Sequence, residues 1–239
     1  MTNDIRENVR NVIEQVNRAA VAAGRKPEEI TLVAASKMND AERVRAAIDA
    51  GIKVCGENRV QEMVEKNALG AYEGCRLHFI GHLQKNKVKN VVGTAELIHG
   101  VDSLSLIETI SRVAGQKGIT QDLLLEVNIG GEESKSGFSP ADIPKILDAA
   151  EDLEHIMVRG LMAIPPVCAS EEENIPFFTA MRQLFVDNGA KKYDNSSMDF
   201  LSMGMSRDFA AAIACGSNMV RIGTGIFGPR NYGTVAAAD

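Results

Sequence analysis

The chain has 239 residues, 45% of them hydrophobic, and a formal net charge of −6. This length suits one large domain or two small ones, and the apolar content is ample for a core. The acidic balance argues against a nucleic-acid partner and against an anionic membrane surface. No apolar run approaches the length of a membrane span, and the N-terminus lacks the apolar core of a signal peptide.

Four cysteines lie far apart without any Cys-x-x-Cys pair: Cys55, Cys75, Cys168 and Cys215. This spacing predicts reduced, mostly buried thiols. Because reduced thiols are typical of the cytosol, we expect a cytoplasmic protein.

The first predicted element is an amphipathic helix over residues 3–24, which ends at Gly24. After it, short apolar runs alternate with helical patterns. The predicted strands are residues 31–36, 53–56, 76–80, 96–99, 122–129, 157–163, 199–203 and 219–223. The predicted helices are residues 41–50, 60–66, 104–117, 140–153, 175–188 and 208–214, with a weaker pattern at 86–92.

Eight strands, each followed by a helix or a gap of helical length, predict an α/β fold of the (β/α)8 TIM-barrel type. The extra N-terminal helix is expected to cover one end of the barrel, and an open doubly wound sheet is the alternative. No composition shift or linker divides the chain, so we predict a single domain over residues 1–239, with the barrel at about 30–232. The last residues, 236–239, are expected to fray.

Lys37 directly follows the first predicted strand, and Asp40 is the expected N-cap of the next helix. In α/β folds, groups that handle ligands lie at the carboxyl ends of strands. A lysine at the rim of an apolar core is suited to act as a Schiff-base amine. The alternative is that Lys37 extends into solvent and has no such role.

A glycine-rich segment, residues 223–228, matches G-x-G-x-x-G after the eighth predicted strand. It lies too near the C-terminus for the rest of a dinucleotide-binding unit. Barrels often hold phosphate at the loops after strands seven and eight, where Ser206 and Gly223-Thr224 would form a cup. A plain glycine-rich turn is the alternative.

Arg221 lies inside the apolar eighth strand, so if it is buried it needs a partner. It could pair with a carboxylate or point its guanidinium at a ligand. Glu57 and Asn58 are open to the same two interpretations, and Asn58 could instead be the N-cap of the following helix.

Cys75, His78 and His82 have the only spacing that resembles metal ligands, but no second ligand pair follows, so we predict no metal site. Hydrolase and nucleotide-kinase motifs are absent from the sequence. The loop around Lys135 is expected to be a solvated loop, with a mobile flap over the rim as the alternative.

Seven segments, in order between about Leu32 and Tyr232, together resemble one family, the pyridoxal phosphate homeostasis proteins, whose barrel is of the alanine-racemase type. They are VAASK (33–37), GENRVQE (56–62), HFIGHLQKNK (78–87), SKSGF (134–138), RGLMAIP (159–165), LSMGMS (201–206) and VRIGTGIFG (220–228). The resemblance implies that pyridoxal 5′-phosphate (PLP) is bound as a Schiff base on Lys37. It also implies that Ser206, Gly223 and Thr224 take the phosphate, that Arg221 faces the pyridine nitrogen and that Asn58 lies near the ring hydroxyl.

The resemblance favours a protein of intracellular PLP (vitamin B6) homeostasis, which buffers or delivers the cofactor with little or no catalysis. An arginine beside the pyridine nitrogen disfavours the proton that makes PLP a strong electron sink. Alanine racemases add a C-terminal domain and a tyrosine as second base, and Tyr72, Tyr193 and Tyr232 are not expected to supply that base. PLP-dependent apo-enzymes are the expected recipients, and a monomer is the expected state. A low-activity amino-acid racemase is the alternative, and a PLP-free barrel lyase that uses Lys37 is a third.

Overall fold

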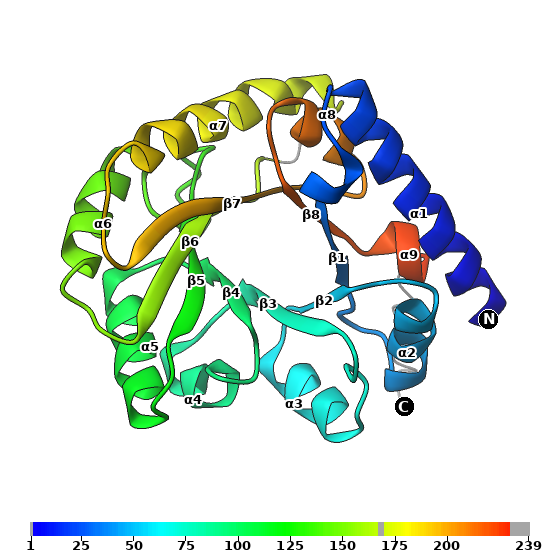
Figure 1. Ribbon diagram of the computed structural model, residues 1–239, viewed down its shortest axis with the longest axis horizontal. Coiled ribbons are helices and arrows are strands. Elements are labelled where there is room, and N and C mark those ends of the chain that lie inside the picture. The colour runs from blue at the N-terminus through cyan, green and yellow to red at the C-terminus, as the bar shows by residue number, and fades with distance from the viewer. Residues whose placement is uncertain (1, 167–169, 230–239) are drawn as a thin grey trace, which may run out of the picture.

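A computed structural model describes residues 2–166 and 170–229. In this part of the chain, eight parallel strands close into a barrel in sequence order, ringed by helices (Figure 1). The strands are β1 (Thr31–Ala35), β2 (Val54–Glu57), β3 (Arg76–His82), β4 (Leu97–Val101), β5 (Gln121–Val127), β6 (Ile156–Ala163), β7 (Ser196–Met205) and β8 (Met219–Ile222). The helices are α1 (Thr2–Ala22), α2 (Ala41–Asp49), α3 (Val60–Ala68), α4 (Val88–Val91), α5 (Leu104–Gln116), α6 (Ile143–Ala150), α7 (Ile175–Gly189), α8 (Phe209–Ala214) and α9 (Thr224–Phe227).

The predicted barrel is confirmed, and the doubly wound sheet is wrong because β8 pairs with β1 and closes the sheet. All eight predicted strands are present. The largest shift is at β7, which begins at Ser196 rather than 199 because its first residues are polar and carry no apolar pattern. The predicted helix at 140–153 is a 3-10 turn followed by α6. The predicted barrel end at 232, Tyr232, the tail 236–239 and Cys168 lie outside the described residues.

The N-terminal helix differs from its predicted position. It does not cover an end of the barrel but lies along the outside, against α2, α8 and α9 (Figure 1). Its apolar stripe is buried there, and Asn8 Nδ2 donates to the carbonyl of Ile226 at 3.2 Å. An apolar helical stripe needs apolar partners, and the outer helices offer them. No helix among the described residues is long and apolar enough to cross a membrane.

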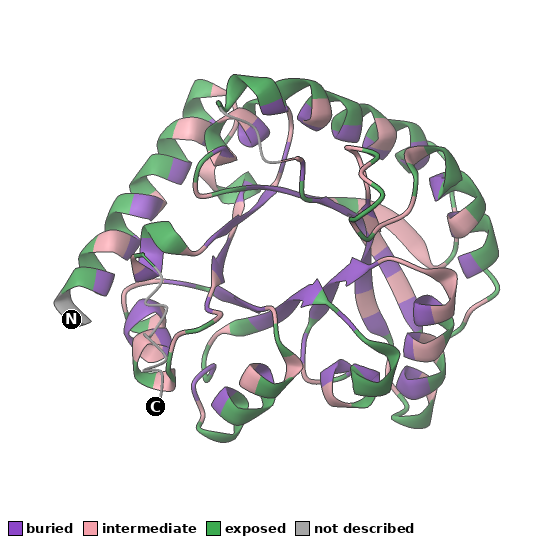
Figure 2. Cartoon of the chain, turned by 180° about the vertical axis from the view of Figure 1, so that it is seen from behind, coloured by how far each residue is buried: buried purple, intermediate pink, exposed green. Residues whose placement is uncertain are grey.

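Apolar side chains form two cores, because successive residues of a strand face opposite sides of the sheet. Figure 2 shows buried residues along the strands and on the inner faces of the helices. The larger core lies between the strands and the helices. The smaller one fills the barrel interior: Val33, Val54, Ile80, Leu97, Leu124, Met162 and Met219. A residue two positions from any of these in its strand therefore also points inward.

Candidate functional site

Lys37 follows β1 in a tight turn at the carboxyl end of the barrel. Val33 and Ala35 pack in the interior core and Ser36 faces outward, so alternation directs Lys37 toward the barrel side. Asn39 Nδ2 donates to the Lys37 carbonyl at 3.0 Å. The turn passes through Met38, which has a positive φ of 60°. These contacts hold the Lys37 backbone in place.

The turn before α2 ends as predicted. Asp40 is the N-cap of α2, and its carboxylate accepts a hydrogen bond from the Arg43 N–H at 2.8 Å. The Met38 N–H donates to Glu62 Oε2 on α3 at 2.8 Å. The turn that carries Lys37 is therefore tied to both neighbouring helices.

A buried polar cluster lies directly behind Lys37, on the outer side of β1 and β2. Glu57 Oε1 accepts three hydrogen bonds: from Ser36 Oγ at 2.6 Å, Lys66 Nζ at 2.6 Å and Tyr72 OH at 2.9 Å. Lys66 Nζ also donates to the Ser36 carbonyl at 2.9 Å. Burial, and then the charge of Glu57, raise the pKa of the Tyr72 hydroxyl, so it stays protonated and donates. Glu57 is thus a structural partner of Lys66 rather than a group of the rim.

Arg221 is buried inside the barrel. It follows Met219, an interior residue, by two positions in β8, so its side chain faces the same side of the sheet. Its Nη1 donates to the Ser202 carbonyl at 2.8 Å and to Ser202 Oγ at 2.5 Å, and its Nη2 donates to the Ala163 carbonyl at 2.9 Å. Burial lowers the pKa of Arg221 to about 10, against the opposing influence of Glu126 and Asp208. The guanidinium is still charged near neutral pH. Its hydrogen-bond partners are oxygens of β6 and β7, not a paired carboxylate.

Two neutral histidines extend this interior network. His99 Nδ1 lies 3.1 Å from Ser202 Oγ, and His99 Nε2 lies 3.0 Å from His78 Nδ1. Burial lowers the pKa of both histidines, that of His78 to about 3. His78, His99 and Ser202 were not predicted as functional. Their signal in the sequence is the one that singled out Arg221, a polar side chain within an apolar strand.

Asn58 follows β2 and lies on the same side as Val54 and Gly56, which face the interior. It is not the N-cap of α3, since Arg59 occupies that position. Among the described residues, no group donates a hydrogen bond to its buried Oδ1 atom. The Asn58 backbone packs closely against Gly81, where an added Cβ would lie 2.2 Å from the Asn58 carbonyl oxygen. Asn58 therefore has a fixed backbone and an unsatisfied side-chain oxygen.

The residues predicted to bind phosphate, Ser206, Gly223 and Thr224, lie just after the ends of β7 and β8. Met205 pairs with Arg221, so Ser206 and Gly223 follow neighbouring strand ends. Gly223 lies beside β1, since a Cβ there would meet the Ala35 carbonyl oxygen at 3.3 Å. The short helix α9 begins at Thr224, and the first N–H groups of a helix have no partner within it. The cup is therefore adjacent to the strand that carries Lys37.

The six predicted site residues thus lie in or just after four strands that are consecutive around the barrel. In that order, β7, β8, β1 and β2, the residues are Ser206; Arg221, Gly223 and Thr224; Lys37; and Asn58. β1 and β2 are consecutive in the chain, and so are β7 and β8. β8 and β1 become neighbours only because the barrel closes.

Three further titratable residues lie at this end of the barrel: His82 and Asp102, whose places at strand ends follow from the predicted strands, and Glu126, which was not predicted. Glu126 lies two residues after Leu124, so its side chain points inward; burial, followed by the charge of Asp102, raises its pKa against the opposing charge of Arg221. His82 Nδ1 lies 3.0 Å from Asp102 Oδ2, with the imidazole largely exposed. Glu126 shows the same sequence signal as Arg221, a charge inside the apolar strand.

The loop around Lys135 is exposed to solvent along much of its length, as expected, and it is also anchored to the barrel. Asn128 Nδ2 donates to the carbonyls of Glu132 and Lys135, at 2.8 and 3.3 Å. Lys135 Nζ donates to the Pro165 carbonyl at 3.3 Å. The loop is therefore held against the carboxyl ends of β5 and β6.

Neither described tyrosine lies on the barrel side of β1, toward which Lys37 is directed. Tyr72 is buried outside the barrel with Glu57. Tyr193 precedes β7, at the opposite end of the barrel, and donates to Asp148 Oδ1 at 2.7 Å. Cys75 and His78 also point apart, since Cys75 contacts Cys55 outside the barrel whereas His78 contacts His99 inside it.

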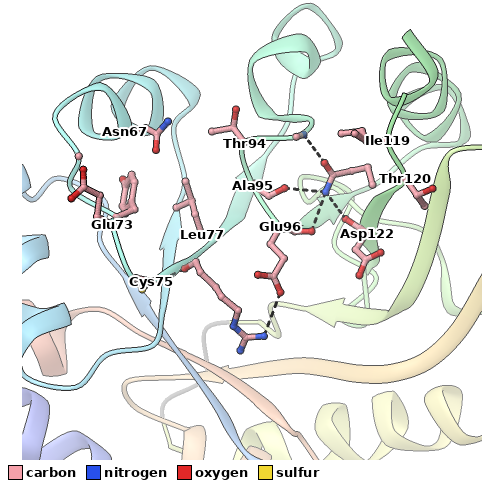
Figure 3. Close-up of a pocket in the computed structure, with 15 residues that line it drawn as sticks. Asn67, Glu73, Cys75, Leu77, Thr94, Ala95, Glu96, Ile119, Thr120 and Asp122 are labelled. Carbon is pink, nitrogen blue, oxygen red and sulfur yellow. Dashed lines mark hydrogen bonds and ion pairs between the residues drawn. The ribbon is translucent and has the colours of Figure 1, made fainter. Parts of the chain in front are cut away.

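A cavity of about 760 Å³ opens at the amino ends of β3, β4 and β5. Figure 3 shows its lining, which includes Cys75, Glu96 and Asp122. Arg76 also lines it and pairs with Glu96 at 3.3 Å. In a parallel barrel, this end is opposite to the carboxyl ends of the strands, so the cavity is separate from the Lys37 rim.

Comparisons with known proteins agree with this geometry. The chain matches the family model described as alanine racemase, N-terminal domain, over residues 2–231. The pyridoxal phosphate homeostasis protein of Escherichia coli (strain K12) is 42% identical over 234 residues, which cover 96% of this chain and 98% of the relative. That of Aquifex aeolicus (strain VF5) is 41% identical over 226 residues, covering 95% and 98%.

A solved structure also matches. PipY of Synechococcus elongatus PCC7942, solved with PLP bound, superposes with a TM-score of 0.77 at 33% identity, covering 89% of this chain and 99% of PipY. Matches at this identity and over nearly the full length of both chains show family membership. The chain belongs to the alanine racemase N-terminal domain family and, within it, to the pyridoxal phosphate homeostasis proteins.

Proposed function

We propose that this protein binds PLP covalently and reversibly through Lys37, and that it buffers or delivers the cofactor in PLP (vitamin B6) homeostasis with little or no turnover. The observation that carries the proposal is the convergence of Ser206, Arg221, Lys37 and Asn58 on four consecutive strand ends. PipY, a relative at 33% identity, was solved with PLP bound. The proposed PLP-binding domain is the whole chain, 1–239, with the barrel at about 30–232.

The donor set of this rim fits PLP. The unpartnered Oδ1 of Asn58 is an acceptor that suits a hydrogen bond donated by the ring hydroxyl. Ser206 and the backbone N–H groups at Gly223 and Thr224 suit the phosphate, because a hydroxyl and free amides are its usual ligands. The Lys37 amine supplies the covalent bond, a Schiff base with the aldehyde carbon.

Arg221 is proposed to face the pyridine nitrogen. When bound, PLP supplies an electron sink, which is strongest when that nitrogen is protonated and paired with a carboxylate. The charged guanidinium of Arg221 disfavours a proton there, because two positive charges would be adjacent. Ser202 and Ala163 hold the guanidinium and prevent it from moving away. The residues that this chain places at the ring therefore favour retention of the cofactor over carbanion chemistry.

Slow amino-acid racemisation is the second candidate function, and Glu126 and His82 at the rim are the observation that favours it, as titratable groups that could exchange a proton. Neither described tyrosine lies there. We further propose a cytoplasmic monomer whose recipients are PLP-dependent apo-enzymes.

The test is an absorbance spectrum of purified wild type and Lys37→Ala, before and after borohydride, with peptide mass spectrometry. Wild type is expected to show a yellow band that borohydride abolishes and a pyridoxyl adduct on Lys37, and the variant neither. Lys85→Ala is the matched control, since Lys85 is an exposed lysine after β3 at the same end of the barrel. A colourless protein that added PLP cannot reconstitute would contradict the proposal.

The proposed delivery role is then tested by measuring the transfer of PLP from the loaded protein to an apo-enzyme. Loaded wild type is expected to activate a PLP-dependent apo-enzyme without consuming or racemising amino acids. Amino-acid turnover that depends on Lys37 would favour the racemase.

A further inference from the structure

We propose that Cys55 and Cys75 are a reversible redox pair, which hydrogen peroxide oxidises to an intramolecular disulfide. Their sulfur atoms lie 3.6 Å apart, although the residues are 20 positions apart in the chain. This is van der Waals contact between two thiols. Both cysteines are free in the structure.

The fold aims the two side chains at each other. Cys55 is on the outer face of β2, since Val54 and Gly56 face the interior. Cys75 directly precedes β3, and Arg76, the next residue, pairs with Val54 in the parallel register. A disulfide needs the sulfurs to approach to about 2 Å. Cys55 pairs with Leu77 in the register, two residues beyond Cys75, so the segment before β3 must shift toward β2 as the two side chains rotate.

The two thiols differ in access. Cys75 is half-buried and lines the cavity at the amino ends of β3 to β5 (Figure 3). Cys55 is fully buried behind it. An oxidant that enters the cavity therefore meets Cys75 first, and Cys55 is placed to react with the oxidised sulfur.

The acidities agree with this division. The hydrogen bond shared with Cys55 lowers the pKa of Cys75, and the charges of Arg76 and Lys53 lower it further. The same hydrogen bond, with burial, raises the pKa of Cys55. The thiolate is the nucleophilic form of cysteine, so Cys75 is the attacking thiol.

The chemistry balances in two steps. The Cys75 thiolate attacks one oxygen of hydrogen peroxide; an S–O bond forms, the O–O bond breaks, and hydroxide leaves and takes up a proton as water, which yields a sulfenic acid. The sulfur of Cys55 then attacks the Cys75 sulfur; an S–S bond forms, the S–O bond breaks, and the departing hydroxide takes the Cys55 proton as a second water. Two thiols lose two electrons in total, and the peroxide is reduced to two waters. A dithiol reductant reverses the bond by exchange.

The test uses the full chain, treated with graded hydrogen peroxide and then blocked with a thiol-alkylating reagent. Non-reducing peptide mass spectrometry is expected to find a Cys55–Cys75 linked peptide, with the loss of two free thiols per chain, and dithiothreitol is expected to restore both. The cross-link is also expected to raise the thermal midpoint of unfolding by several degrees, because it constrains the unfolded chain. PLP content is not part of the readout, so the result does not depend on the proposed function.

Variants separate the roles of the two thiols. Cys55→Ala is expected to leave Cys75 as a sulfenic acid that dimedone traps, followed by oxidation that dithiothreitol does not reverse. Cys75→Ala is expected to leave Cys55 unreacted under the same treatment. Cys215→Ser, the matched control at the C-cap of α8, is expected to keep the disulfide. Oxidation of wild-type Cys75 to the sulfinic acid without a link to Cys55 would overturn the proposal, as would a bridge to Cys168, to Cys215 or between two chains.

Discussion

Lys66→Met tests whether the buried cluster behind Lys37 stabilises the fold by pairing the Glu57 charge. In the wild type, Lys66 Nζ lies 2.6 Å from Glu57 Oε1, and both side chains are almost fully buried. Methionine keeps most of the stem of the lysine but removes the cation. Glu57 would then keep only the hydrogen bonds from Ser36 Oγ and Tyr72 OH.

Breaking a buried pair from one side leaves an uncompensated charge, and such changes lower the free energy of unfolding by about 3–5 kcal/mol. Glu57→Gln should be milder, at about 2 kcal/mol, because Lys66 retains the Ser36 carbonyl and Glu62. The double variant should lose less than the sum of the two, since neither charge is then unpaired. The two residues are in contact, so a coupling energy of about 1–3 kcal/mol is expected.

The assay is urea unfolding followed by far-ultraviolet circular dichroism, on wild type, both single variants and the double variant. Arg76→Met is the control, because the Arg76–Glu96 pair is half-exposed and should change the free energy of unfolding by less than about 1 kcal/mol. If Lys66→Met changes it no more than the control does, or if the two substitutions simply add, the pairing does not stabilise this part of the fold.

Three further changes have defined outcomes. Ser202→Ala removes one acceptor of Arg221 and should lower the free energy of unfolding by about 1–3 kcal/mol in urea titrations. Because the pKa of His78 is about 3 in the folded chain, stability should be full above pH 6.5 and fall as the pH drops toward 3, by about 1.4 kcal/mol per pH unit for this one group. Gly81→Ala should destabilise by about 3 kcal/mol or more in the same titrations, since its Cβ would meet the Asn58 backbone at 2.2 Å.

Matched variants check each of these. Gly189→Ala should be tolerated, since its Cβ would meet only Met198, at 3.4 Å. His78→Gln should have a shallower dependence of stability on pH than wild type. Equal slopes for wild type and His78→Gln would show that this histidine does not titrate between pH 3 and 6.5. A Ser202→Ala protein as stable as wild type would mean that the carbonyls alone hold Arg221.

Local sequence signals predicted the strands and several of the site residues because these depend on periodicity and chain order. The apolar run before Lys37 is enough to place that residue at a strand end, and alternation is enough to place Arg221 inside the barrel once its strand is known. The same rule, applied to charges within apolar strands, would also have found Glu126. Asp40 was predicted as an N-cap from its side chain and the helical pattern that follows, and the structure confirms it.

The contacts between distant residues could not be predicted in this way. From the sequence, Glu57 could either contact a ligand or pair with another side chain of the protein. The packing of α3 against β2 decides this, because it pairs Glu57 with Lys66. The contact between Cys55 and Cys75 depends on the register of β2 with β3. The position of α1 depends on which outer helices expose apolar surface, so the expectation that it covers an end of the barrel was wrong.

The sequence alone thus determined the order of the elements and which residues lie at the strand ends, because hydrophobic period and capping are properties of short segments. Only the tertiary structure decided which strand ends are neighbours. The strands that carry Arg221 and Lys37 are far apart in the chain and become neighbours because β8 closes onto β1, with Arg221 beside Val33. Closure removes the exposed edges of the sheet and buries the interior side chains, and both gains require the whole set of strands at once.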